Sequence, residues 1–125
     1  MNEVSFKQHD KRKVIGSKVN GFTLLALLAI RHSREAWYNL GDFLLDEQGR
    51  SEAAIECFRT ALRVAPDYAD AMFNLALLLQ RTNQYAEAAD YWRRYLASDC
   101  QSEWAARARR SLKFCEMQIN LIASA

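Results

Sequence analysis

The sequence predicts an all-α fold built from pairs of helices that stack on one another. A long segment recurs, because residues 35–66 are followed almost at once by the similar residues 70–100. Apolar side chains inside both copies repeat with a period near 3.6 residues, which is typical of helices. The chain of 125 residues contains one Pro and four Gly, so few positions interrupt a helix. Repeats of this length are typical of helix pairs that bury their apolar faces against each other.

The two copies align through their apolar and small residues. Residues 36–40 (AWYNL) match residues 71–75 (AMFNL) at an offset of 71 − 36 = 35, whereas Phe58 matches Trp92 at an offset of 92 − 58 = 34. One extra residue therefore lies between these points in the first copy, near the segment DEQGR. A turn accommodates an insertion better than a packed helix does, so we expect a turn there.

The periodicity divides the chain into six helices. In the first copy the apolar pattern runs from Trp37 to Leu45, and Gly49 is expected to break the helix. Ser51 is suited to cap the next helix, which Pro66 should end. The expected helices span residues 22–31, 35–47, 51–64, 69–82, 85–97 and 103–120.

The apolar segment FTLLALLAI, residues 22–30, has two interpretations. Ala36 and Ala71 each follow another alanine by ten residues, and this register puts the segment in the place of the second helix of an eroded earlier copy. The alternative is one continuous helix over residues 22–46, although Ser33 can cap a new start. The segment does not span a membrane, since nine helical residues reach about 13 Å against a hydrocarbon core of about 30 Å.

The segment 103–120 continues the register without a partner helix. Its small and apolar residues, among them Ala105, Ala108 and Cys115, form one stripe, whereas charged residues face away. A terminal helix needs this pattern, with one face for the last repeat and one for water. Further apolar residues lie off the stripe, at Phe114, Met117, Leu121 and Ile122. This surplus surface either pairs two copies of the chain or packs against residues 22–30.

The spacing of the first copy resembles the tetratricopeptide repeat, whose pattern is W-x2-L-G-x2-Y, then A-x3-F, then P. The first copy supplies Trp37, Leu40, Gly41, Ala54, Phe58, Ala61 and Pro66. The second copy departs from the pattern, since Met72, Ala76 and Cys100 stand at the places of Trp, Gly and Pro.

The resemblance implies an alpha-alpha superhelix, a right-handed solenoid of antiparallel helix pairs. Residues 21–125 would form this domain after a basic N-terminal arm at 1–20. Its parts would be an eroded repeat helix at 22–31, repeats at 35–66 and 69–100, and a capping helix at 103–120.

The resemblance also implies a concave groove, lined by the first helix of each pair, that binds a peptide or protein segment. The partner-binding residues would be Glu35, Tyr38, Asn39, Asp42, Asp46, Asp70, Phe73, Asn74, Leu77, Arg81 and Arg107, with Leu45, Gln80, Trp104 and Ser111 beside them.

These groove residues have alternative roles. The equivalent Asn39 and Asn74 can each donate to and accept from a peptide backbone, or they are simply tolerated on an exposed helix face. Tyr38 and Phe73 are either anchors for a ligand or packing between repeats, and packing is the preferred interpretation. The acidic residues of the groove predict a partner with basic character. Only Asn74 fits the Lys and Asn clamp by which some family members hold C-terminal carboxylates, so chaperone tails are not expected.

Charge and cysteine usage limit the classes of function. The net charge of +2 is too small to predict nucleic-acid binding by the whole chain. Residues 1–20 carry +5 − 2 = +3, which fits a solvated tail better than an arm that contacts phosphate. Three cysteines cannot all pair, and their spacing forms no metal site, so we expect a reducing cytoplasm and no metal.

No motif for catalysis is present. The sequence contains no Gly-rich phosphate loop, no H-E-x-x-H and no G-x-S-x-G. We therefore predict no enzyme activity and no cofactor. The predicted function is a bacterial-type cytoplasmic scaffold that binds a protein, and the alternative is a structural piece that forms homo-oligomers through its terminal helices. A nucleic-acid accessory is a weaker alternative, based on the basic arm and the outer arginines.

Overall fold

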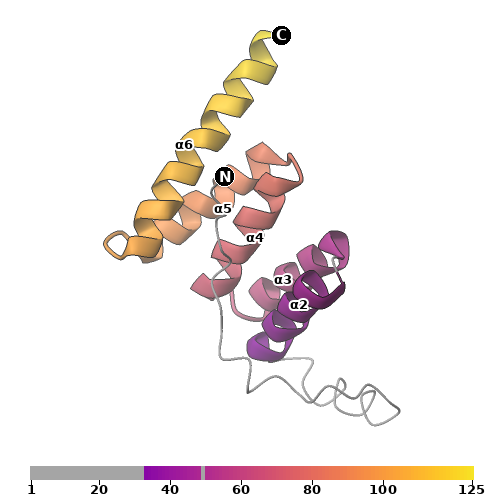
Figure 1. The fold of residues 1–125 in the computed structure, drawn as a ribbon. Helices are drawn as coiled ribbons and strands as arrows, with labels where there is room; N and C mark the ends of the chain where they lie inside the picture. The colour runs from indigo at the N-terminus through magenta and orange to yellow at the C-terminus, as the bar shows by residue number, and fades with distance from the viewer. Residues whose placement is uncertain (1–32, 49) are drawn as a thin grey trace. The chain divides into compact units, whose positions relative to one another are not determined.

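The structure, a computed structural model, describes residues 33–48 and 50–125. These residues form five helices and no strand (Figure 1), so the predicted all-α helical-repeat fold is confirmed. The helices are α2 (Arg34–Gln48), α3 (Ser51–Val64), α4 (Ala69–Arg81), α5 (Tyr85–Ser98) and α6 (Glu103–Ser124). The predicted arm at 1–20 and the predicted helix at 22–31 lie outside the described residues.

The start of α2 is fixed by a serine cap. Ser33 is not helical, and its hydroxyl accepts a hydrogen bond from the backbone N–H of Ala36 at 3.2 Å. This bond satisfies one of the first N–H groups of the helix, which have no partner inside it. The helix therefore does not continue through Ser33, and the alternative of one continuous helix over residues 22–46 is wrong.

The start of α3 differs from the expectation. Ser51 is the first helical residue, and Arg50 occupies the cap position without a side-chain hydrogen bond. The backbone of Arg50 instead donates from its N–H to the carbonyl of Leu44 at 3.0 Å. Ser51 already has helical geometry, so the prediction that it caps the helix was wrong by one residue, within the usual uncertainty of helix ends.

The described helices fall into two compact units, which we call the N-terminal unit (described residues up to Tyr68) and the C-terminal unit (Ala69–Ala125). In the N-terminal unit α2 packs on α3. Tyr38 contacts Phe58 and Tyr68, with ring centroids 5.7 and 5.5 Å apart, and both Tyr38 and Phe58 are fully buried. Gly41 brings the helices close, because a Cβ on it would lie 2.9 Å from the Phe58 ring.

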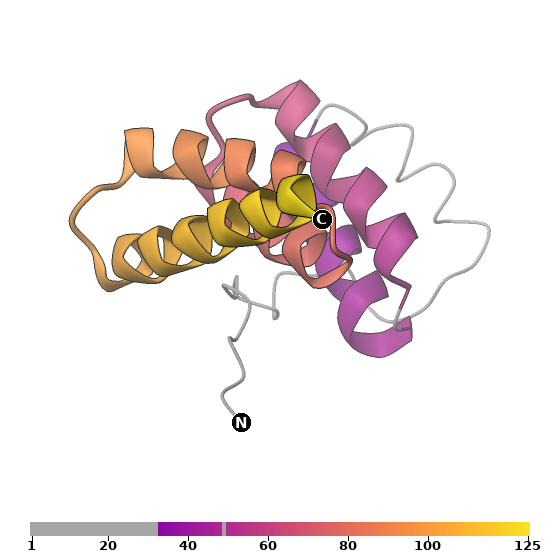
Figure 2. The same cartoon turned by 90° about the horizontal axis from the view of Figure 1, so that it is seen from above.

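In the C-terminal unit α5 packs against both α4 and α6. Figure 2 shows α5 and α6 running antiparallel, joined by a short loop. Phe73 of α4 contacts three rings edge-on, those of Trp92 and Tyr95 on α5 and of Trp104 on α6, at centroid distances of 4.9, 5.3 and 5.1 Å. Edge-on aromatic pairs stabilise a core beyond their buried area. This aromatic cluster therefore holds the three helices of the unit together.

The end of α4 is closed by an asparagine in the left-handed conformation. Asn83 has φ of 67°, its N–H donates to the carbonyl of Gln80, and the N–H of Gln84 donates to the carbonyl of Leu79. These two bonds form a Schellman motif, which satisfies the last carbonyls of a helix. Asn adopts this backbone more readily than most residues do. In the repeat alignment Asn83 corresponds to Gly49 (49 + 34 = 83).

The loop between α5 and α6 is organised by Asp99. Its carboxylate accepts hydrogen bonds from the hydroxyls of Tyr95 and Ser102 and from the backbone of Gln101 and Ser102. The Ser102 hydroxyl, followed by the Tyr95 hydroxyl, holds the pKa of Asp99 below its usual range. Ser102 also caps α6, because its hydroxyl accepts from the N–H of Ala105 at 3.2 Å. The loop therefore sets where α6 begins.

The three cysteines should differ in reactivity. Burial raises the pKa of Cys57 and of Cys115 to about 11, whereas Cys100 is exposed. Because the thiolate is the reacting form, we expect one fast thiol per folded chain and two that react at least about tenfold more slowly. A thiol-reagent time course at pH 8 measures this, with the Cys100→Ser variant expected to lose the fast phase.

The same thiols predict a dependence of stability on pH. Their pKa values in the folded chain lie above the unfolded value of 9.0. Their contribution to stability is therefore complete below about pH 9 and is lost as the pH rises toward 11. Urea unfolding at pH 8 and at pH 10.5 should show a lower midpoint at the higher pH, and a smaller difference in the Cys57→Ala variant. Equal midpoints would contradict the burial of both thiols.

Candidate functional site

The candidate binding surface that the structure describes within one unit is the α4–α6 face. Its α4 members recur at intervals of three and four residues, and so do its α6 members, which places each set on one side of its helix. The α4–α6 face consists of Asp70, Phe73, Asn74 and Leu77 of α4 and Trp104, Arg107 and Ser111 of α6. The edge-on contact between Phe73 and Trp104 joins the two helices at this face.

The centre of the α4–α6 face is buried. Phe73 and Asn74 are 0% exposed and Leu77 is 1% exposed, and Ser111 is buried as well. The ring of Phe73 contacts three aromatic neighbours, which favours a packing role over ligand anchoring for this residue. We call these four residues the floor of the face.

The accessible part of the face is formed by Asp70, Trp104 and Arg107, each of them partly exposed. The guanidinium of Arg107 lies 5.1 Å from the centre of the Trp104 ring. A cation over an indole face is an electrostatically favourable contact, and a planar guanidinium keeps its outward N–H groups available while it stacks. We call Asp70, Trp104 and Arg107 the rim of the face.

Gln80, expected beside the groove, has an internal role. Its side-chain oxygen accepts from the indole N–H of Trp92 at 3.0 Å and from the thiol of Cys115 at 3.4 Å. One amide oxygen therefore links α4, α5 and α6. The sequence did not predict this linking role of Gln80. The available signal was that a buried tryptophan needs a hydrogen-bond acceptor for its N–H.

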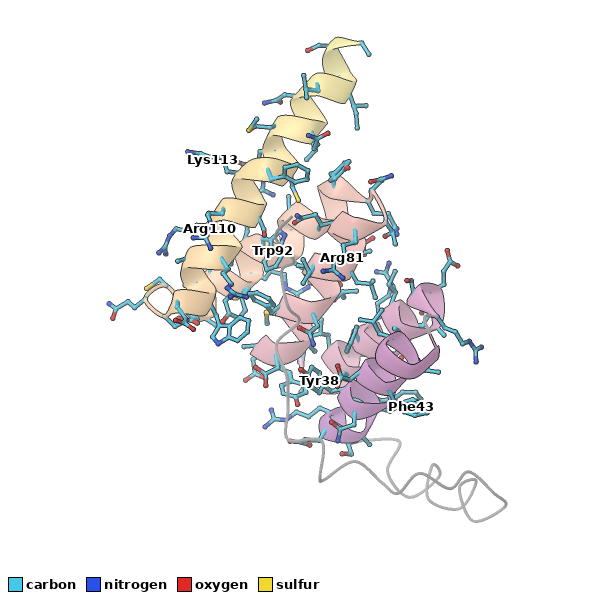
Figure 3. The ribbon with its side chains drawn as sticks, viewed as in Figure 1. Tyr38, Phe43, Arg81, Trp92, Arg110 and Lys113 are labelled. Atoms are coloured by element: carbon cyan, nitrogen blue, oxygen red, sulfur yellow. The ribbon has the colours of Figure 1, made fainter. Side chains whose placement is uncertain are left out.

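The predicted residues on α2 lie in the N-terminal unit. Glu35 is exposed and forms an ion pair with Arg34, with Oε2 and Nε 3.1 Å apart. Asn39 is partly exposed, whereas Tyr38 and Asp42 are buried. The side chain of Asp46 lies outside the described residues. Arg81, predicted on α4, is exposed at the end of that helix, as Figure 3 shows.

The acidic residues that predicted a basic partner therefore differ in their exposure and in their neighbours. Asp42 is buried and Glu35 already has a cationic neighbour, while Asp70 is partly exposed on the rim. Of the four acidic residues, Asp70 is the member on the rim of the α4–α6 face.

The described residues also bear on metal binding and on membrane insertion. Within residues 33–48 and 50–125, no three His, Cys, Asp or Glu side chains cluster so that they could hold a metal ion. None of the helices in this part of the chain is both long and apolar enough to cross a membrane.

Comparison with known proteins identifies a similar family for the repeated part of the chain. No curated protein matches the chain. The family model described as "Tetratricopeptide repeat" matches residues 44–103, which include the end of α2, all of α3, α4 and α5, and the first residue of α6. The match therefore includes the second helix of the first repeat and both helices of the second repeat, together with the connections between them. Residues 44–103 are therefore similar to tetratricopeptide repeats, in agreement with the resemblance of the sequence to that repeat.

Proposed function

We propose that this chain is a non-catalytic interaction module that binds a peptide or protein segment on the α4–α6 face. Tetratricopeptide repeats generally mediate interactions between proteins, and residues 44–103 match this family. The observation that carries the proposal is the rim of the α4–α6 face, where Trp104 and Arg107 stack on one another at the surface.

The rim offers three kinds of contact to an extended segment. The indole of Trp104 provides apolar area at low entropy cost, and aromatic residues of this kind often dominate binding energy. Arg107 can donate to backbone carbonyls or to a carboxylate, and Asp70 can accept from an N–H group or a cation. The floor residue Phe73 contacts the Trp104 ring edge-on at 5.1 Å, so its role in this proposal is to position the rim.

The proposal also includes roles for the two asparagines, the charge of the partner and the cellular compartment. Asn39 on α2 is accessible and is proposed to bind peptide backbone, whereas the buried Asn74 belongs to the floor. A basic segment is proposed to lie near Asp70. The three free cysteines support a reducing compartment, which we propose is the cytoplasm.

A random peptide library displayed on phage and selected on the purified full chain tests the proposal. Selected peptides would then be measured by titration calorimetry against Arg107→Glu and Asp70→Asn variants. We expect Arg107→Glu to weaken binding at least about tenfold, because it places a carboxylate beside the Trp104 ring face. Asp70→Asn should weaken basic peptides more than neutral ones.

The matched control is Arg63→Glu on α3, an exposed arginine whose guanidinium donates to Thr60 at 2.7 Å. It makes the same change of charge on a helix of the N-terminal unit, which contributes no residue to the α4–α6 face. Circular dichroism confirms that all variants are folded. Peptides that bind the Arg107→Glu chain as tightly as the parent, or that lose affinity equally with Arg63→Glu, would place the binding surface elsewhere.

A further inference from the structure

Helix α6 is much longer than the helix it packs on. It has 22 residues and α5 has 14, which correspond to lengths of about 33 and about 21 Å. Figure 1 shows that the C-terminal part of α6 extends past α5 within their unit. From Asn120 onward every residue is exposed. A helical end of this kind is marginal unless its apolar side packs on something.

The exposed side of this helix carries an apolar stripe. Phe114, Met117 and Leu121 are spaced by three and four residues and are 42%, 56% and 61% exposed. At 100° per residue they lie within a sector of about 60°, with Met117 and Leu121 on the side of the helix away from the buried Ala108. Phe114 lies nearer the packed side, and its ring contacts that of Tyr85 on α5 edge-on, with centroids 5.9 Å apart. We call Phe114, Met117 and Leu121 the α6 stripe.

The charge around the α6 stripe is distributed unevenly. Residues 117–125 contain no charged side chain. Glu116 is paired with Arg93 of α5, with Oε2 and Nη2 3.2 Å apart. Cations lie at the N-terminal end of the stripe, where Figure 3 shows Arg110 and Lys113 on the side of α6 away from Trp92.

We propose that the α6 stripe binds the α6 stripe of a second copy, as an antiparallel helix pair with a two-fold axis near Met117. Phe114 and Leu121 are equidistant from the midpoint between positions 117 and 118, so the stripe is complementary to itself when reversed. Phe114 then faces Leu121 of the second copy, and the two Met117 side chains meet near the axis. Two-fold contacts of this type use the same surface on both copies.

The charges on α6 favour the antiparallel orientation and a second copy of the chain as the partner. In the antiparallel pair, Arg110 and Lys113 lie beside the uncharged residues 117–125 of the second copy, so no like charges meet. A parallel pair would place each cation beside its own equivalent, which is destabilising. A strongly charged partner would find no opposite charge along the stripe itself, whereas a second copy needs none.

The size of the α6 stripe sets the expected strength. An aromatic side chain buries roughly 150–250 Å². If the three half-exposed side chains of the stripe are taken to be of this order, the stripe offers on the order of 300 Å² per copy, or about 600 Å² in total. This area is well below the roughly 1,200 Å² of a stable interface, which predicts a weak, concentration-dependent dimer.

Sedimentation equilibrium of the full chain, from about 1 µM to about 1 mM, tests the dimer. We expect the mean mass to rise from one copy toward two across this range. Leu121→Glu should raise the dissociation constant at least about tenfold, because it buries a carboxylate at the interface. The matched control is Ala123→Glu, the same charge two residues away and on the other side of the helix, which should dimerise like the parent.

Crosslinking tests the orientation. In a Cys100→Ser background, Met117→Cys should crosslink to itself through a short bismaleimide, because position 117 lies near the axis. Arg110→Cys should not, since the two copies of position 110 would be 15 residues apart along the pair, about 22 Å. Stronger self-crosslinking at 110 than at 117 would overturn the antiparallel arrangement.

The remaining outcomes also decide the proposal. A chain that stays monomeric at every concentration would mean that another part of the same chain, or another partner, covers the α6 stripe. Dimers that persist unchanged in Leu121→Glu would place the interface elsewhere. Because Leu121 lies outside the α4–α6 face, these results are independent of the peptide-binding test.

Discussion

The Trp92→Ala chain should unfold at a much lower urea concentration than the parent, with a loss of about 3–5 kcal/mol. The Trp92 ring is fully buried, contacts Phe73 edge-on at 4.9 Å, and donates its N–H to Gln80. Truncation leaves a large cavity and removes one of the hydrogen-bond donors to the Gln80 side-chain oxygen. The free energy of unfolding of a typical domain is only about 5–15 kcal/mol, so much of the stability of the C-terminal unit should be lost. Urea unfolding followed by circular dichroism measures the effect.

Two variants separate the causes of this loss. Trp92→Phe keeps most of the ring but removes the N–H donor to Gln80, and should cost about 1–3 kcal/mol. Trp104→Ala removes an indole that is partly exposed, and should cost less than Trp92→Ala. If Trp92→Ala unfolds at the parent midpoint, or costs less than Trp104→Ala, the aromatic cluster around Phe73 does not hold the unit together.

The Gly41→Ala chain should be less stable than the parent, although alanine is the better helix former. The intrinsic preference favours alanine by about 1 kcal/mol. The new Cβ, however, would lie 2.9 Å from the Phe58 ring and 3.2 Å from the Cβ of Cys57. Because Phe58 is fully buried against Tyr38, the ring has little room to move. Overpacking costs about 1–3 kcal/mol, so after the gain in helix preference we expect a net loss of up to about 2 kcal/mol in urea unfolding.

The equivalent position in the second copy provides the control. Ala76 matches Gly41 at an offset of 76 − 41 = 35 and is fully buried in α4. Ala76→Gly should also destabilise, by about 1 kcal/mol, because there the helix preference acts without a clash to relieve. The double variant Gly41→Ala with Phe58→Leu should lose less than the sum of the two single losses, since the smaller side chain gives the new Cβ room. A stabilising Gly41→Ala would mean that α2 and α3 are not in close contact at this residue.

Local periodicity was enough to predict most of the helices. The bounds of α3 agree with the expected range, α4 and α5 differ from theirs by one residue at the C-terminal end, and α2 is longer than expected by one residue at each end. Helix α6 continues four residues beyond the expected end, because the uncharged segment after Asn120 contains no breaker. Ser33 was recognised as a cap, since a serine hydroxyl before a helical pattern acts on the backbone that directly follows it.

The predicted groove residues were harder to place from the sequence. Ala71–Leu79 is buried without interruption in α4, so this helix has no open side along its middle. A helix of this kind has no polar stripe from which a binding face can be identified. The resemblance to the tetratricopeptide repeat assigned Asn74 and Asp42 to the groove, yet both are buried.

The sequence by itself determined the repeat, the helix pairs and the resemblance to the tetratricopeptide repeat, because these depend on residue spacing within short segments. Only the tertiary structure decided which of the predicted binding residues are accessible, that Gln80 links three helices, and that the α6 stripe extends past its neighbour. Burial depends on side chains contributed by distant parts of the chain, and no local pattern contains that information.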